Sequence, residues 1–137
     1  MLYVAPIRIG LGVLWLVAAR LAGAAGPSAV LAFGGSTFVV VFLSFNDPRH
    51  AFLHGGEPEP APLDATYARP LEQALAATLP STVGVGVLAL AAVAWQPILT
   101  ALLGGISAGL GVAGVLRALT VDPALWFDRR KKLLYRR

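Results

Sequence analysis

The stretch that decides the fold is residues 73–116, QALAATLPSTVGVGVLALAAVAWQPILTALLGGISAGLGVAGVL. It contains no Asp, Glu, Lys or Arg, and it is long enough for two membrane-spanning helices of about 20 residues each. Gln96-Pro97 near its middle predicts a tight turn between these helices. Residues 21–46 form a second stretch without charge. The chain is therefore predicted to be an integral membrane protein.

The composition supports this prediction. Of the 137 residues, 57% are hydrophobic and 13% are charged, whereas soluble domains carry roughly 25% charged residues. The net charge of +4 arises largely from a basic C-terminal tail, which includes Arg129, Arg130, Lys131 and Lys132. A block of this kind beside an apolar span favours contact with anionic lipid headgroups, so no nucleic-acid partner is expected. The chain has no cysteine and hence no disulfide framework.

Proline and glycine positions predict an all-α membrane protein with four transmembrane helices arranged as two tandem hairpins. The expected parts of this single membrane domain are hairpin one (6–46), a cytoplasmic loop (47–79), hairpin two (80–118) and a basic cytoplasmic tail (119–137). Residues 55–62 are proline-rich and should be extended. Leucines spaced four apart predict a short interfacial amphipathic helix over residues 70–79, feeding the third span.

The orientation follows from the placement of Lys and Arg. Both hairpin turns lack these residues and the tail is rich in them, so the tail is expected in the cytoplasm. Counting back through four spans places the long loop and the N-terminus on the same side, in the cytoplasmic (inner) membrane of the cell. Three spans, with the third or fourth helix re-entrant, are the alternative.

An internal duplication is a further hypothesis. The matching segments are residues 9–14 with 83–88, Gly34-Gly35 with Gly104-Gly105, and Asp47-Pro48-x-x-x-Phe52 with Asp122-Pro123-x-x-x-Phe127. Each Asp-Pro pair is expected to start a helix that its Phe anchors in the membrane surface. Chance similarity is the alternative, because Gly, Leu and Val abound in membrane helices.

Asp47, His50 and His54 form the candidate metal site. They stand at i, i+3 and i+7, on one face of a helix beginning at Pro48. Two imidazoles and a carboxylate suit Zn²⁺ or another transition metal, and no other cofactor is expected. Side chains in contact with solvent or lipid headgroups, without metal, are the alternative interpretation.

Arg20 leads the candidate ligand or anion residues, which also include the hydroxyls of Ser36, Thr37 and Ser107. It follows Arg8 by about 18 Å of helix, which places it inside the outer half of the bilayer, where an arginine indicates function. It could instead extend to the outer surface, and the hydroxyls could bond to their own backbone. Arg117 near the inner end of the fourth helix is interpreted as an interface anchor.

Gly104, Gly105 and Gly109 are the candidate helix-packing residues. Small residues at this spacing allow close backbone approach in lipid, within one chain or between chains. Four short helices leave little interior space, so a pore would arise more naturally in a homo-oligomer or a larger membrane complex.

Gly34-Gly35-Ser36-Thr37-Phe38 resembles the Gly-Gly-x-Thr-Thr-Phe stretch of small four-helix fluoride channels. The run lies in a different span, and the glycine-rich, arginine-containing N-terminal signature of those channels is absent, so the chain is not assigned to that family. The sequence leaves two functions open. One is an oligomeric transporter or channel for a small solute or anion, and the other is a non-catalytic accessory or assembly subunit. The sequence contains no recognisable set of catalytic residues, so an enzyme is the least supported function.

Overall fold

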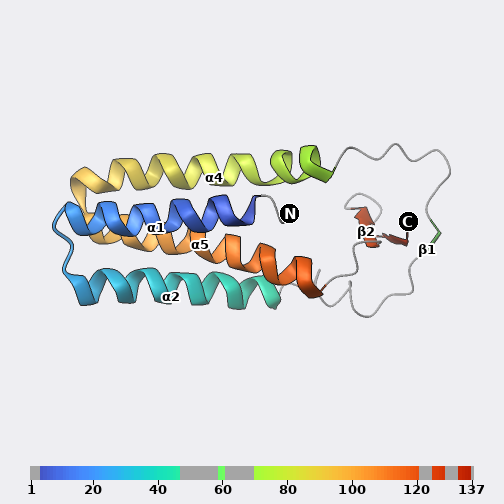
Figure 1. Cartoon of the computed structure of the whole chain (residues 1–137), viewed down its shortest axis with the longest axis horizontal. Helices are drawn as coiled ribbons and strands as arrows, with labels where there is room; N and C mark the ends of the chain where they lie inside the picture. Colours follow the sequence, from blue (N-terminus) through green and yellow to red (C-terminus); the bar gives the residue numbers. More distant parts are fainter. Residues whose placement is uncertain (1–3, 47–58, 61–69, 121–124, 129–132, 137) are drawn as a thin grey trace.

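A computed structural model describes residues 4–46, 59–60, 70–120, 125–128 and 133–136. Its body consists of helices α1 (Ala5–Leu21), α2 (Gly26–Phe45), α4 (Pro70–Trp95) and α5 (Pro97–Thr120), which lie side by side (Figure 1). Among the described residues, three stretches are long and apolar enough to cross a membrane: α2, Thr78–Trp95 of α4, and α5. Helix α1, with 17 residues, runs alongside them. The predicted helical membrane architecture is confirmed to this extent.

Proline and glycine set the helix ends. Pro6 and Pro27 lie in the first turns of α1 and α2, where a missing N–H breaks no helical hydrogen bond. Helix α1 ends at Leu21. Gly23 explains this end, because its φ of 99° lies in the left-handed region that terminates helices.

Helix α4 is longer than predicted. Residues 70–79, expected as a separate interfacial helix, continue without a break into the span, and Pro80 lies inside the helix. A proline removes only one helical hydrogen bond, and neighbouring hydroxyls can support the turn around it. The hydroxyls of Ser81 and Thr82 donate to the carbonyl oxygen of Thr78 at 3.0 and 2.8 Å.

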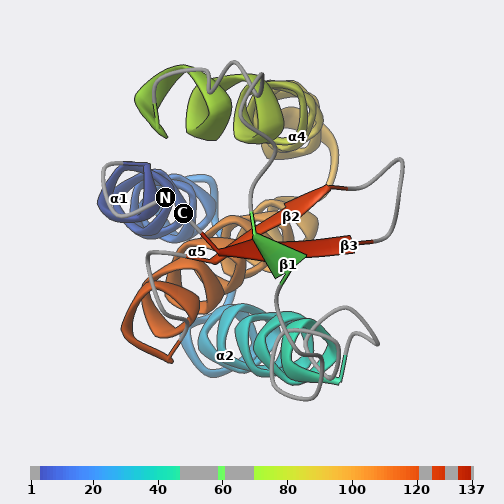
Figure 2. The same ribbon diagram turned by 90° about the vertical axis from the view of Figure 1, so that its right-hand side faces the viewer.

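Helix α5 is the central helix of the bundle. It packs against α1, α2 and α4, whereas α1 and α2 make few contacts with each other (Figure 2). A Cβ built on Gly104 would lie 2.7 Å from the carbonyl oxygen of Gly12 in α1. On the α2 side, a Cβ on Gly105 would overlap the backbone of Phe33, and one on Gly109 would lie 2.9 Å from the carbonyl oxygen of Thr37. These glycines therefore allow backbone contact on two faces of α5.

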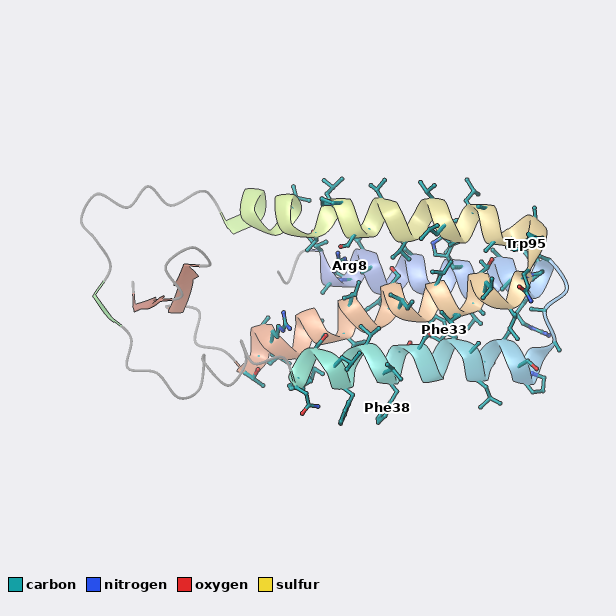
Figure 3. All side chains as sticks on the ribbon, turned by 180° about the vertical axis from the view of Figure 1, so that it is seen from behind. Arg8, Phe33, Phe38 and Trp95 are labelled. Atoms are coloured by element: carbon teal, nitrogen blue, oxygen red, sulfur yellow. The ribbon has the colours of Figure 1, made fainter. Side chains whose placement is uncertain are left out.

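The outer face of the bundle is apolar. The side chain of Phe38 in α2 is 70% exposed and points away from α5 (Figure 3). It stacks on Phe42, with ring centroids 6.2 Å apart. Exposed apolar surface of this extent suits contact with lipid rather than water.

A small sheet lies beyond the end of the bundle where the N-terminus is found (Figure 1). Its strands, in the order β1-β3-β2, are β1 (Glu59–Pro60), β2 (Leu125–Asp128) and β3 (Leu133–Arg136). Strand β3 is parallel to β1 and antiparallel to β2. The expected surface helix after Asp122-Pro123 is therefore wrong, since Phe127 lies in β2. Aromatic and Leu residues in two short segments favour strand pairing there.

The matched glycine pairs of the suggested duplication lie in different environments. A Cβ on Gly34 or Gly35 would meet no atom within 4 Å, whereas Gly104 and Gly105 are packed against neighbouring helices. Correspondingly, α2 lies at the edge of the bundle and α5 at its centre. The duplication stays a prediction, and its first Asp-Pro segment, residues 47–52, lies outside the described residues.

Candidate functional site

Arg8 is a buried cation held between two helices. It lies near the start of α1, and only 7% of its surface is exposed. Its Nε donates to the Thr82 hydroxyl at 2.9 Å, and its Nη2 donates to the Thr78 carbonyl at 2.8 Å and to the Ser81 hydroxyl at 2.5 Å. All three acceptors are on α4, and Figure 3 shows Arg8 beside this helix. Arg8 thereby fastens α1 to α4.

The acceptors are oriented toward Arg8 by α4 itself. The hydroxyls of Ser81 and Thr82 each have one proton, which goes to the carbonyl oxygen of Thr78. Their lone pairs therefore remain for Arg8, which carries no acceptor of its own. In the part of the chain that the structure describes, Nη1 of Arg8 donates no hydrogen bond, so two of its N–H groups are unused.

Arg117 is the second cation at this end of the bundle. It lies in the last turn of α5, and its Nη2 donates to the carbonyl oxygen of Ser44 in α2 at 3.1 Å. Its Nε is buried and has no hydrogen-bond partner within the described ranges. A buried donor without an acceptor is costly, and more so on a charged group, so an anion placed here would be stabilised.

One cavity of about 210 Å³ brings the two arginines together. Its wall includes Arg8, Arg117, Ser44 and Ser81, together with small and apolar residues of α1 and α5. None of the described residues lining it is acidic. Pockets for drug-sized ligands have roughly 300–1,000 Å³, so this cavity suits a small ion or part of a larger molecule. We call it the arginine pocket.

The arginine pocket lies at the boundary of the apolar part of the bundle. The helix from Pro97 to Arg117 is about 30 Å long at 1.5 Å per residue, which equals the thickness of a hydrocarbon core. Trp95, 84% exposed, lies at the opposite end (Figure 3), and tryptophan is typical of the membrane–water interface. Thr78, a wall residue of the pocket, lies about 26 Å of helix from Trp95, close to the thickness of a hydrocarbon core. A bilayer spanned by these helices would have its headgroups near the pocket.

Arg20 lies away from the arginine pocket, at the far end of α1. It is exposed, and its Nη1 donates to the carbonyl oxygen of Ala24 at 2.5 Å. A Cβ built on Gly26 would lie 3.2 Å from Nη1, so the guanidinium covers the start of α2. A cation in this position stabilises the carboxyl end of its own helix.

The hydroxyls grouped with Arg20 connect helices instead. The Ser36 hydroxyl lies 2.9 Å from the carbonyl oxygen of Leu102, and the Thr37 hydroxyl lies 3.0 Å from that of Gly105. The Ser107 hydroxyl donates to the carbonyl oxygen of Arg8 at 3.1 Å. The structure thus places these side chains between α5 and its neighbours and does not bring them together with Arg20.

Other candidate residues lie outside the described residues. These are the metal candidates Asp47, His50 and His54 and the basic residues Arg129, Arg130, Lys131 and Lys132. The described residues contain no group of three or more His, Cys, Asp or Glu that could hold a metal ion. Zinc binding and headgroup contact by the tail stay predictions.

The sequence signal for the arginine pocket was present but incomplete. Arg8 and Arg117 each stand near the end of an apolar helix, and a hydroxyl-rich segment, Thr78 to Thr82, opens the third span. Only the side-by-side arrangement of α1, α4 and α5 shows that these features share one cavity. Comparisons with protein-family models, with curated proteins and with solved structures gave no match, so the functional assignment rests on this site.

Proposed function

We propose that the chain is an integral membrane protein that binds a small anion of the phosphate type in the arginine pocket. The observation that carries this proposal is the convergence of Arg8 and Arg117 on one cavity, with the buried Nε of Arg117 unpaired in the described part of the chain. Guanidinium groups match the geometry of phosphate oxygens and bind them with charge-assisted hydrogen bonds. The Ser44 hydroxyl in the wall, which has no partner among the described residues, would add another donor.

The packing favours a non-catalytic accessory or assembly role over transport. A transport path along the bundle would have to pass α5, where backbone contacts at Gly104 and Gly105 leave no space against α1 and α2. An anion in the arginine pocket would instead link the ends of α1, α2 and α5, and this end of the bundle would bind a partner. Copurification of a stoichiometric larger partner at native expression supports this role. A self-oligomer that carries phosphate into proteoliposomes supports the transporter hypothesis.

The first prediction tests anion binding. Phosphate exchanged for chloride at constant ionic strength should raise the midpoint of thermal unfolding of the purified protein in neutral detergent. At ten times the dissociation constant, binding contributes about 1.4 kcal/mol. Arg117→Gln should lose this specific gain, because the unpaired Nε and the charge are removed.

Arg20→Gln is the matched control, since Arg20 lies in the last turn of α1, at the other end from Arg8. Phosphate also stabilises proteins by exclusion from their surface, and this variant measures that general effect. Equal stabilisation of Arg117→Gln and Arg20→Gln by phosphate would count against the proposal.

A second prediction concerns the orientation in the inner membrane. A reporter active only in the cytoplasm should be active when fused after Arg137 or inserted within residues 55–62. Insertions at Gly26 or Gln96 should report the exterior, because these turns lack Lys and Arg. The location of both hairpin turns at one end of the bundle supports this arrangement (Figure 1). An exterior signal from residues 55–62 would overturn it.

A further inference from the structure

We infer that the anion of the arginine pocket is the phosphate of an anionic membrane lipid. This inference rests on the proposed function and adds the source of the anion. The shared chemistry of a dissolved phosphate and a lipid headgroup is the phosphate group. The position of the pocket, its apolar surroundings and its charge favour the lipid.

The position of the pocket is that of a lipid phosphate. Thr78, whose carbonyl accepts a hydrogen bond from Arg8, lies about 26 Å of helix from Trp95, close to the thickness of a hydrocarbon core. A lipid phosphate is held at this depth by its acyl chains, so its local concentration beside the pocket is high without any added contact. A dissolved anion must instead leave water to reach it, which costs hydration free energy.

Exposed apolar side chains directly follow or precede the wall residues on three helices. Ile7 precedes Arg8 in α1, Leu79 follows Thr78 in α4, and Leu43 precedes Ser44 in α2. Their exposed fractions are 57%, 51% and 62%. Acyl chains lying along these side chains would leave the phosphate beside the arginines. The apolar side chains thus suit the acyl chains of a lipid, and the arginines suit its phosphate.

The donors left over in the pocket match one phosphate group. They are Nη1 of Arg8, Nε of Arg117 and the hydroxyl of Ser44, none of which has a partner in the described residues. Phosphate oxygens accept several hydrogen bonds at once, so one group can satisfy donors from three helices. The occupant would thereby link α1, α2 and α5 at this end.

The charge of the pocket selects among lipids. Its wall contains two cations and, among the described residues, no carboxylate. A zwitterionic headgroup would bring its own ammonium group toward these cations, whereas an anionic headgroup brings none. We therefore expect phosphatidylglycerol and phosphatidic acid to bind more tightly than phosphatidylcholine.

The experiment titrates the full chain in neutral detergent with each of these three lipids and counts bound lipid by native mass spectrometry. The wild type should bind one anionic lipid at least about tenfold more tightly than phosphatidylcholine, and Arg117→Gln should lower that affinity by about 10- to 100-fold. Arg20→Gln should bind as the wild type does. Arg117→Lys keeps the charge but not the Nε donor, so it should show a smaller loss, and circular dichroism verifies that each variant is helical.

The outcomes separate the two proposals. If inorganic phosphate stabilises the wild type but not Arg117→Gln, while all variants bind the three lipids equally, the lipid assignment is overturned and the anion site remains. If neither phosphate nor lipid distinguishes Arg117→Gln and Arg117→Lys from Arg20→Gln, both proposals are overturned. Weaker anionic-lipid binding in both Arg117 variants, with the larger reduction in Arg117→Gln and wild-type affinity in Arg20→Gln, supports the lipid assignment.

Discussion

Replacing Gly105 with alanine should destabilise the bundle by about 3 kcal/mol, a value at the upper end for added volume in a packed core. The new Cβ would overlap the Ser36 hydroxyl and the backbone carbonyl of Phe33 in α2. A backbone atom cannot rotate away, so α2 and α5 must separate along their contact. The hydrogen bond from Thr37 to the carbonyl of Gly105 would lengthen as a result. Thermal and denaturant unfolding in neutral detergent measure the loss.

Gly35→Ala is the matched control for Gly105→Ala. A Cβ at Gly35 would meet nothing within 4 Å, so the substitution adds helix propensity without a collision. It should leave the free energy of unfolding unchanged or raise it by up to about 1 kcal/mol. Equal destabilisation by the two variants would show that Gly105 does not lie at the α2–α5 contact.

Arg8→Met should destabilise the bundle by about 3 kcal/mol, because it removes charge-assisted hydrogen bonds while recovering part of the desolvation cost. Three donors to α4 are lost, and α1 and α4 make few other contacts. In hydrogen–deuterium exchange of the protein in detergent, the backbone amides of α4 near Thr82 should exchange faster than in the wild type. Those in the middle of α5 should change less, because α5 is held by all its neighbours.

Arg20→Met provides the comparison for Arg8→Met, since it removes an exposed arginine from the same helix. It should change stability little and leave exchange in α4 unaffected. If Arg8→Met and Arg20→Met had the same exchange pattern in α4, Arg8 would not fasten this helix.

The existence of membrane-spanning helices could be predicted because it depends on local composition. The absence of charge over residues 73–116 and the prolines at the helix starts were sufficient for this. The end of α1 depends on the left-handed φ of Gly23, which composition does not determine. Arg20 lies in the last turn of α1, and its place within the bilayer stays a prediction.

The central place of α5 could not be predicted from glycine content alone. Gly34-Gly35 in α2 and Gly104-Gly105 in α5 are identical pairs, yet only the second pair is packed. Which helix is surrounded depends on the arrangement of all four. For the same reason, Arg8 and Arg117 looked like separate residues near helix ends, and their shared cavity follows only from α1 and α5 lying together.

The central position of α5 has a consequence for biogenesis, because α5 is the last of the four helices to leave the ribosome. Helices α1, α2 and α4 make few contacts with one another, so they associate only loosely in the bilayer until α5 has been inserted. Their small residues and hydroxyls gain most of their partners only when α5 inserts among them. The four-helix bundle is therefore assembled only after α5 has been synthesised, and a chain interrupted before Pro97 would leave α1, α2 and α4 unassembled and exposed to membrane quality control.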